Sequence, residues 1–288
     1  MLRKSVDIII PTLKPEEDFV TLLASLAMQT VKPNRIIIMD TIADSGISCE
    51  QYAEKANVSD ITTVVHLPKA EFNHGMTRNK AVELSDSEYF ICMTQDALPC
   101  DDKLIERLIA VMDDKIKMSY ARQIAKDDAC EIEKITREFN YPTVSKIKTE
   151  DDKQNLGIKT YFASNVCAAY ERETFEKLGG FVKTDFNEDM IYAGTLLQAG
   201  YSLAYAADAC VKHSHNLNGI MQYRRNKDIA RSQSEHPEIF GGVKSESEGI
   251  RLVKTTIAEL ARKNKIYLVP KLIWQSGCKY LGFRAGRK

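Results

Sequence analysis

The side chains best placed for chemistry follow a short apolar run at residues 89–94, YFICMT, which predicts a buried strand of a parallel sheet. The run ends in Gln95 and Asp96, and a helix-patterned segment at 102–113 comes soon after. Asp96 is therefore expected at the carboxyl end of a central strand, where open α/β sheets bind their ligands. A carboxylate there suits Mg²⁺ or Mn²⁺ on a diphosphate, because these cations take oxygen ligands. An Asp that opens a turn explains the position equally well.

Two histidines offer a further pair of metal ligands. His213 and His215 follow a predicted strand at 201–211, and their spacing puts both imidazoles on one side if the chain stays extended. One of them could complete a metal site with Asp96. The spacing alone is weak support, since five histidines in 288 residues often fall close together by chance.

A third candidate group opens the helix-patterned segment at 190–200. The residues before it are Asn187, Glu188 and Asp189. A carboxylate at a helix mouth that faces the crevice can take a proton from an acceptor hydroxyl. The structural alternative is strong, because Asn is a good N-cap and acidic residues favour the first helical turn.

Strands that alternate with helices must position these groups. Separated by helical patterns, strands are expected at 5–10, 35–39, 61–66 and 89–94. This alternation predicts an α/β fold with a right-handed, mostly parallel sheet and helices on both faces. An edge or mixed strand is expected at 117–124 and a further strand at 162–170. The charged segment 127–160 predicts helical pieces and loops that form a lid or acceptor-side wall, although a solvated insertion fits equally well.

A bound nucleotide would lie beyond the ends of the first, second and fourth strands, which carry Thr12, Asp40 and Asp96. Asp40 could accept a hydrogen bond from the N3–H of a pyrimidine base, and a strand-ending turn is its alternative. The first strand-to-helix turn, PTLKPEED, has no glycine, so the GxGxxG fingerprint is absent, and no GxxxxGK[ST] occurs. These absences argue against a nicotinamide oxidoreductase and exclude a P-loop protein.

The segment EFNHGMTRN at 71–79 contains further polar candidates. Gly75 lets the backbone approach a ligand, and Arg78 offers a fixed fork of donors suited to phosphate. The alternatives are a solvated helix charge for Arg78 and a structural histidine for His74. The candidate contacts with a donor or acceptor are Asn73, His74, Asn165 and Glu188.

The composition limits the classes of protein to which the sequence can belong. The 288 residues are 44% hydrophobic and 28% charged, which predicts a soluble protein of one large domain with an extension or two small domains. A formal net charge of zero argues against nucleic-acid binding. The seven scattered cysteines include no CxxC pair and indicate reduced thiols of a cytoplasmic protein. The N-terminal MLRKSVDIIIPT predicts a first strand and not a signal peptide, and no segment approaches the roughly 20 apolar residues of a membrane span.

The chain from residue 218 onward is helix-patterned and increasingly basic. We divide the sequence into a domain at 1–230 and a helical basic C-terminal extension at 231–288. The last stretch, 271–288, mixes aromatic and basic residues with no acidic residue, which suits peripheral contact with the anionic inner face of the cytoplasmic membrane. The alternative is a terminal helix that packs its aromatics on the domain and keeps its charges in water.

Six passages carry a resemblance to a known family: IIIPTLKPEEDFVTLLASLAMQ (8–29), EFNHGMTRN (71–79), TQDALP (94–99), LGIKTYFASNVCAAYERETFEKLGGF (156–181), NEDMIYAGTLLQAGYSLAYAADACVKHSHN (187–216) and KYLGFRAGR (279–287). Through them the chain resembles a family 2 glycosyltransferase of the GT-A fold. Within that family it is similar to the bacterial rhamnosyltransferases of cell-surface polysaccharide synthesis. The passages cover most of residues 5–230 in the right order.

The resemblance implies roles for the donor-binding residues. Thr12 and Asp40 would hold the pyrimidine base, and Arg78 would lie near the base or the phosphates. Asp96 matches the second carboxylate of the family's DxD motif and would bind Mg²⁺ or Mn²⁺ on the diphosphate, with Gln95 beside it as a nucleotide-sugar contact.

The resemblance also implies the catalytic and remaining metal-site residues. Asp189 matches the Asp of the family's ED pair and would be the general base, and His213 or His215 would complete the metal site. Two passages depart from the family pattern. Thr94 stands where DxD has its first Asp, which puts the ribose or sugar contacts of that carboxylate in doubt, and the D-G-S-x-D loop is altered to DTIADSG at 40–46.

The function implied is an inverting transfer of L-rhamnose from dTDP-L-rhamnose to a saccharide or lipid-linked saccharide acceptor. Two rival hypotheses remain. One keeps the fold and changes the donor to a UDP-sugar, and the other is a catalytically silent domain that binds a nucleotide sugar or scaffolds polysaccharide assembly.

Overall fold

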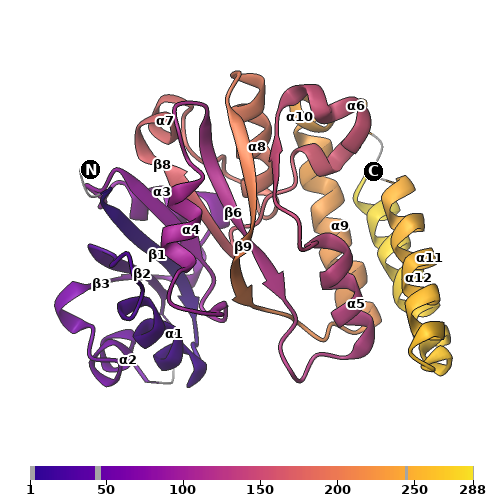
Figure 1. The fold of residues 1–288 in the computed structure, drawn as a ribbon, viewed down its shortest axis with the longest axis horizontal. Helices are drawn as coiled ribbons and strands as arrows, with labels where there is room; N and C mark the ends of the chain where they lie inside the picture. The colour runs from indigo at the N-terminus through magenta and orange to yellow at the C-terminus, as the bar shows by residue number, and fades with distance from the viewer. Residues whose placement is uncertain (1–3, 43–46, 244–245, 288) are drawn as a thin grey trace.

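A nine-stranded mixed sheet runs through the computed structural model, which describes residues 4–42, 47–243 and 246–287 (Figure 1). Its strands are β1 (Val6–Leu13), β2 (Arg35–Thr41), β3 (Thr62–Leu67), β4 (Tyr89–Met93), β5 (Leu98–Pro99), β6 (Ile116–Ile124), β7 (Lys146–Lys148), β8 (Cys167–Glu171) and β9 (Ser202–Lys212). Their order is β3-β2-β1-β4-β8-β6-β9-β5, with β7 also paired to β9. The strands β1 to β4 are parallel, and β8 joins the sheet antiparallel to both β4 and β6. The order of the strands reverses between β1 and β4, which creates a switch point at the strand ends where a nucleotide was expected.

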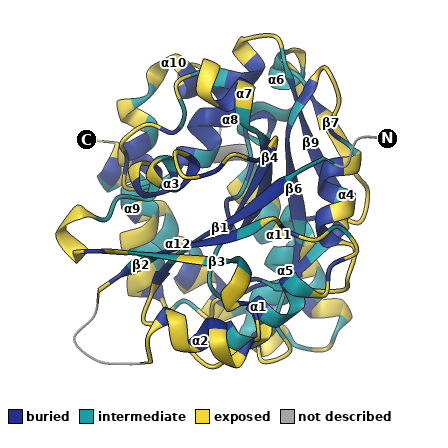
Figure 2. Cartoon of the chain, turned by 90° about the vertical axis from the view of Figure 1, so that its left-hand side faces the viewer, coloured by how far each residue is buried: buried dark blue, intermediate teal, exposed yellow. Residues whose placement is uncertain are grey.

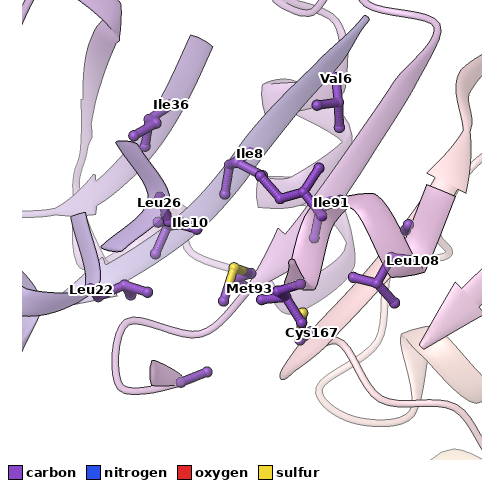
Figure 3. Packing of buried hydrophobic residues seen from close by; sticks show 14 of the residues in the cluster. Val6, Ile8, Ile10, Leu22, Leu26, Ile36, Ile91, Met93, Leu108 and Cys167 are labelled. Atoms are coloured by element: carbon purple, nitrogen blue, oxygen red, sulfur yellow. The ribbon is translucent and has the colours of Figure 1, made fainter. Parts of the chain in front are cut away.

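The helices cover both faces of this sheet. They are α1 (Asp18–Ala27), α2 (Cys49–Lys55), α3 (His74–Val82), α4 (Leu104–Ala110), α5 (Glu131–Asn140), α6 (Lys153–Leu156), α7 (Arg172–Lys177), α8 (Glu188–Gln198), α9 (Gly219–Glu235), α10 (Pro237–Phe240), α11 (Glu246–Arg262) and α12 (Val269–Gly286). Alternating side chains of β1 and β2 pack on α1, α2 and α4 on one face (Figure 3), and on α3 and α8 on the other. The strands are accordingly buried and the outer helix surfaces exposed (Figure 2).

The strand expected at 117–124 as an edge or mixed strand is the mixed one. It forms β6, which lies between β8 and β9, antiparallel to the former and parallel to the latter. Two other predicted strands differ from those in the structure. The strand expected at 162–170 begins only at Cys167, because the residues before it form a loop. The first strand continues through Pro11 and Thr12 to Leu13, since β2 pairs with it over that length. Residues 43–46 of the altered loop at 40–46 lie outside the described residues.

The segment 127–160 is not a solvated insertion. Its helix α5 buries Ile132 and Ile135 against Leu260 of α11 and Leu272 of α12. The segment also supplies β7, which no pattern predicted. Its role as a lid or acceptor-side wall stays a prediction.

The C-terminal helices lie along α9 on the far side from β1–β3 (Figure 1). A Cβ on Gly282 of α12 would come within 2.2 Å of the Tyr223 carbonyl oxygen of α9, so only glycine allows this close approach. The division into 1–230 and 231–288 stays a prediction, and residue 230 itself lies inside α9.

Candidate active site

Asp96, His213 and His215 come together where β4 and β9 end. The Nε2 atoms of both histidines lie 3.5 Å from Asp96 Oδ2. The two-residue strand β5 brings them together, because it pairs with β9 so that Leu98 lies opposite Lys212. The three side chains offer one oxygen and two nitrogens within 4.8 Å of one another, which is a geometry that can hold a cation.

Gln123 of β6 holds His213 from behind. Its Oε1 lies 3.1 Å from His213 Nδ1 and also accepts from Arg137, and its Nε2 donates to Tyr141 Oη at 2.6 Å. Because an amide oxygen only accepts, His213 carries its proton on Nδ1 and presents the Nε2 lone pair to the cluster. A bonded Nδ1–H with a free Nε2 is the usual arrangement of a metal-binding histidine.

The protonation states of the cluster also suit a metal. Burial lowers the pKa of His213 and that of His215, and the Asp96 carboxylate opposes this effect only in part. Both imidazoles are therefore neutral near pH 7, which is the form that binds a metal. The residues fit a divalent cation, and the two nitrogens favour Mn²⁺ over Mg²⁺, which prefers carboxylates and water.

Asp189 is held at the start of α8 by two backbone donors. Its Oδ2 accepts from Asn165 N–H at 2.9 Å, and its Oδ1 accepts from Met190 N–H at 2.8 Å. Burial and the adjacent negative charge of Glu188 raise the pKa of Asp189 to about 7. The carboxylate is only half-buried, so it combines fixed geometry with access and with a pKa suited to proton transfer at neutral pH.

Glu188 points the other way, into the protein. Its carboxylate pairs with Arg78 Nη1 at 3.1 Å and accepts from Asn165 Nδ2 at 3.0 Å. Burial alone would raise the pKa of Glu188, but the Arg78 guanidinium brings it below its ordinary value. The pKa values of the two neighbouring carboxyls are therefore shifted in opposite directions. This pattern makes Glu188 a charged structural group and leaves Asp189 as the candidate proton acceptor.

Arg78 is buried, so the alternative interpretation of this residue as a solvated helix charge is wrong. It is 3% exposed, and its Nη1 also donates to the His74 carbonyl at 2.8 Å. A phosphate contact through Arg78 stays a prediction, and it would require the side chain to leave Glu188.

Thr12 and Asp40 come together as expected, and a third residue joins them. Thr12, Asp40 and His66 lie in register across β1, β2 and β3. Thr12 Oγ1 donates to Asp40 Oδ1 at 2.9 Å, while His66 Nδ1 lies 3.0 Å from Asp40 Oδ2. Its other nitrogen lies 2.8 Å from Glu50, and the bonds to Glu50 and Asp40 raise the pKa of His66. A protonated His66 thus fixes the Asp40 carboxylate at the strand ends.

This arrangement predicts a pH-dependent contribution of His66 to stability. A pKa raised on folding stabilises the protein fully below the unfolded value of about 6.5, and the effect is lost as pH rises through the folded pKa. Since the side chain is 45% exposed, we expect less than about 1 kcal/mol. Urea unfolding of His66→Gln and wild type should therefore differ more at about pH 6 than at about pH 9. A difference that stays constant between these two pH values would contradict the assignment.

The remaining predicted contacts have structural partners. Gln95 exchanges two hydrogen bonds with the Leu13 backbone, at 2.8 and 3.2 Å. Asn73 caps α3 by accepting from Met76 N–H and donates to the Thr184 carbonyl. The His74 ring lies edge-on to Phe72 with centroids 5.0 Å apart. Contacts of these side chains with a donor or acceptor stay predictions.

Two residues of the site were not predicted. His66 could have been, since it ends a strand beside the one that ends in Asp40. Gln123 carries no such signal, because nothing near it in the sequence marks it as the partner of a histidine ninety residues later.

A mixed sheet with a topological switch point, a carboxylate–imidazole cluster at its strand ends and two neighbouring carboxyls with separated pKa values fit a GT-A-type sugar transferase. Residues 7–179 match the family described as "Glycosyl transferase family 2". The chain belongs to this family and is a glycosyltransferase.

Two relatives are similar to the chain over most of its length, and both are described as rhamnosyltransferases. The chain is 36% identical to the O-antigen chain rhamnosyltransferase WbaN of Salmonella anatum over 90% of this chain and 81% of the relative. It is 35% identical to the O-antigen chain rhamnosyltransferase RfbN of Salmonella typhimurium strain LT2 over 98% and 89%.

Solved structures share the fold at low sequence identity. The mannosyltransferase PcManGT from Pyrobaculum calidifontis, in complex with GDP-Man and Mn²⁺, has a TM-score of 0.64 at 14% identity, over 97% of this chain and 88% of that one. TarS residues 1–349 from S. aureus, in complex with UDP-GlcNAc, has a TM-score of 0.57 at 15% identity, over 98% and 90%. In the part of the chain that the structure describes, no helix has the length and apolar character of a membrane span.

Proposed function

We propose that this glycosyltransferase moves L-rhamnose from dTDP-L-rhamnose to a saccharide or lipid-linked saccharide acceptor in cell-surface polysaccharide synthesis. The observation that carries the proposal is a hydrogen-bonded connection between two sites, Asp189 with its raised pKa and the cluster of Asp96, His213 and His215. Gln123, which holds His213, also donates to Ser164 Oγ, and the next residue, Asn165, donates its backbone N–H to Asp189. The likeness to the two rhamnosyltransferases supports the choice of donor.

The chemical step is a single inverting displacement. Asp189 takes the proton of the attacking acceptor hydroxyl, while its own position is fixed by the N–H groups of Asn165 and Met190. Asp96 and the two histidines would hold a divalent cation, which when bound would supply positive charge to offset the charge that develops on the departing diphosphate. Gln123 keeps His213 in the tautomer that binds.

The donor base would be held by Asp40. Its carboxylate, aligned by Thr12 and His66, accepts from the N3–H of a pyrimidine. Thymine and uracil both carry this group, so Asp40 favours a pyrimidine without separating dTDP from UDP.

A donor-binding panel separates the hypotheses. Calorimetry with Mn²⁺ should give the tightest binding for dTDP-L-rhamnose among dTDP-L-rhamnose, UDP-glucose, UDP-GlcNAc and GDP-mannose. Preference for a UDP-sugar would keep the fold and discard the rhamnosyl assignment. Tight binding of dTDP-L-rhamnose without turnover in the presence of membrane-extracted acceptor would favour the silent domain.

The rate of transfer should depend on pH through Asp189. Because the raised pKa leaves much of this carboxyl protonated below neutrality, kcat should rise about tenfold per pH unit below about pH 7 and level off above it. Initial rates across this range at saturating donor and Mn²⁺ check the expectation. A flat profile down to about pH 5 would mean that Asp189 is not the base.

We further propose that α12 rests on the cytoplasmic face of an anionic membrane. Trp274 is 66% and Tyr280 56% exposed, which supports membrane contact over a helix that packs all its aromatics on the domain. The helix packs on α9 through Gly282 and Gly286, and the Trp274 indole lies beside Gly219 of α9. Exposed apolar and basic side chains therefore share its outer surface: Ile273, Trp274, Tyr280, Leu281, Lys271, Arg284 and Arg287.

Vesicle flotation tests this contact. The protein should bind vesicles rich in phosphatidylglycerol, bind phosphatidylcholine vesicles poorly, and detach at high salt. The double variant Trp274→Ser/Leu281→Ser should bind at least several-fold more weakly. The control Met28→Ser/Val144→Ser removes two equally exposed apolar side chains elsewhere and should bind as wild type. Equal loss in both double variants would contradict a role of α12.

A further inference from the structure

Lys148 of β7 is a buried lysine that the chemical step does not use. The residue is 3% exposed, and its Nζ donates to three oxygens: the Lys159 carbonyl at 3.1 Å, the Phe162 carbonyl at 2.5 Å and Tyr120 Oη at 3.3 Å. An ammonium has three N–H donors, so these acceptors use all of them. Burying this group is unfavourable unless its hydrogen bonds are made, and here they are.

The surroundings of Lys148 allow it to hold these carbonyls in either protonation state. Burial lowers its pKa to about 7, the negative charge of Asp152 opposes this effect, and the charges of Lys146 and Lys159 add to it. Asp152 itself pairs with Lys146 at 3.6 Å. A neutral amine keeps two N–H donors for the two carbonyls and can accept from the Tyr120 hydroxyl.

The two carbonyls belong to the segment 159–166, which leads into β8 and touches both parts of the active site. Ser164 Oγ of this segment accepts from Gln123 Nε2 at 2.9 Å, and Asn165 N–H donates to Asp189 Oδ2 at 2.9 Å. The position of the segment therefore sets the position of the backbone donor that holds the Asp189 carboxylate.

We propose that Lys148 is a positioning residue of the transfer reaction, because its Nζ fixes the segment 159–166 and through it the Asn165 N–H that holds Asp189. Among the described residues, the Phe162 carbonyl accepts from Lys148 alone. Loss of the lysine donors therefore frees the chain three residues before Asn165.

A weaker bond from Asn165 has a defined effect on the base, and this consequence rests on the proposed role of Asp189. The N–H group lowers the pKa of Asp189, against the larger effects of burial and the Glu188 charge. Weakening the bond therefore raises that pKa, so kcat falls below neutral pH and recovers at high pH, while the KM for the donor stays unchanged. Other titratable or charged groups also act with Asp189: Glu188, Arg78, Arg225, Cys92, Tyr141 and Tyr170.

The first measurement is the pH profile of kcat for Lys148→Met at saturating donor and Mn²⁺. The midpoint of the rising limb should move up by about one pH unit, which lowers kcat at about pH 6 by about tenfold and leaves it near wild type at about pH 9. Lys148→Gln keeps N–H donors without the charge and should move the midpoint less. Lys146→Met removes a charge two residues earlier in β7 and should leave the midpoint in place.

Hydrogen exchange is the second measurement and needs no activity. Peptides covering residues 159–166 should exchange at least several-fold faster in Lys148→Met than in wild type, and at the wild-type rate in Lys146→Met. If Lys148→Met does not fold, Lys148→Gln takes its place in both measurements.

An unmoved midpoint, equal shifts in Lys148→Met and Lys148→Gln, or unchanged exchange would overturn the proposal. Equal shifts would mean that the lost charge, and not the lost hydrogen bonds, acts on Asp189. A wild-type profile without a rising limb would instead refute Asp189 as the base, and exchange would then decide whether Lys148 holds the segment.

Discussion

Replacing Asp189 by Asn should lower the rate of sugar transfer by about 10²–10⁴-fold, because general-base assistance is lost. The side chain keeps its size, and the cluster of Asp96, His213 and His215 is untouched, so donor affinity should change little. Nucleotide release under single-turnover conditions measures the rate, and calorimetry with dTDP-L-rhamnose and Mn²⁺ measures the affinity. Thermal unfolding, recorded in parallel, confirms that the variant is folded.

Asp185→Asn is the matched control for that variant. Asp185 lies four residues earlier in the same loop and pairs on the surface with Arg231 at 2.8 Å. Its loss should leave both rate and affinity near wild type. Full activity of Asp189→Asn, or an equal loss in Asp185→Asn, would remove Asp189 from the base role.

The second large effect is expected at the metal cluster. Asp96→Ala removes the only carboxylate of the three ligands and should raise the Mn²⁺ concentration for half-maximal activity by at least about 10–100-fold. The His213 and His215 rings have centroids 4.7 Å apart, and Asp96 Oδ2 lies 3.5 Å from the Nε2 atom of each. Loss of Asp96 therefore removes the oxygen that both imidazoles share.

Titration of activity with Mn²⁺ in the Asp96→Ala variant provides the measurement, and the exposed neighbour Asp102→Ala is its control. Gln123→Leu should give a smaller shift in the same direction, because it frees the His213 tautomer without removing a ligand. An unchanged Mn²⁺ dependence in Asp96→Ala would show that the ion binds elsewhere.

Local patterns predicted which strand ends lie at the ligand site, because apolar strand runs and the carboxylates that end them are visible in short stretches of sequence. Asp40 and Asp96 each follow an apolar run in the sequence, and both lie at the carboxyl ends of the strands that these runs form. The pairing of Thr12 with Asp40 follows from the parallel register of β1 and β2. The metal site was expected to join Asp96 to His213 or His215, and in the structure both histidines lie beside Asp96.

What could not be predicted depends on contacts between distant residues. Asp96 reaches the histidines through β5, which is too short to leave a pattern in the sequence. Arg78 is buried because Glu188, far along the chain, pairs with it. The composition of residues 117–124 is compatible with either an edge strand or an interior strand. Only the pairing with β8 and β9 places this strand inside the sheet.

Release of dTDP from dTDP-L-rhamnose by the wild-type protein, with Mn²⁺ or with EDTA, tests the central claim most directly. Slow hydrolysis to water should be measurable without acceptor, should stop in EDTA, and should accelerate when membrane-extracted acceptor is added. Selective turnover of this donor that requires the metal is the predicted result. No binding and no turnover of any pyrimidine nucleotide sugar, with or without acceptor and Mn²⁺, would contradict the account.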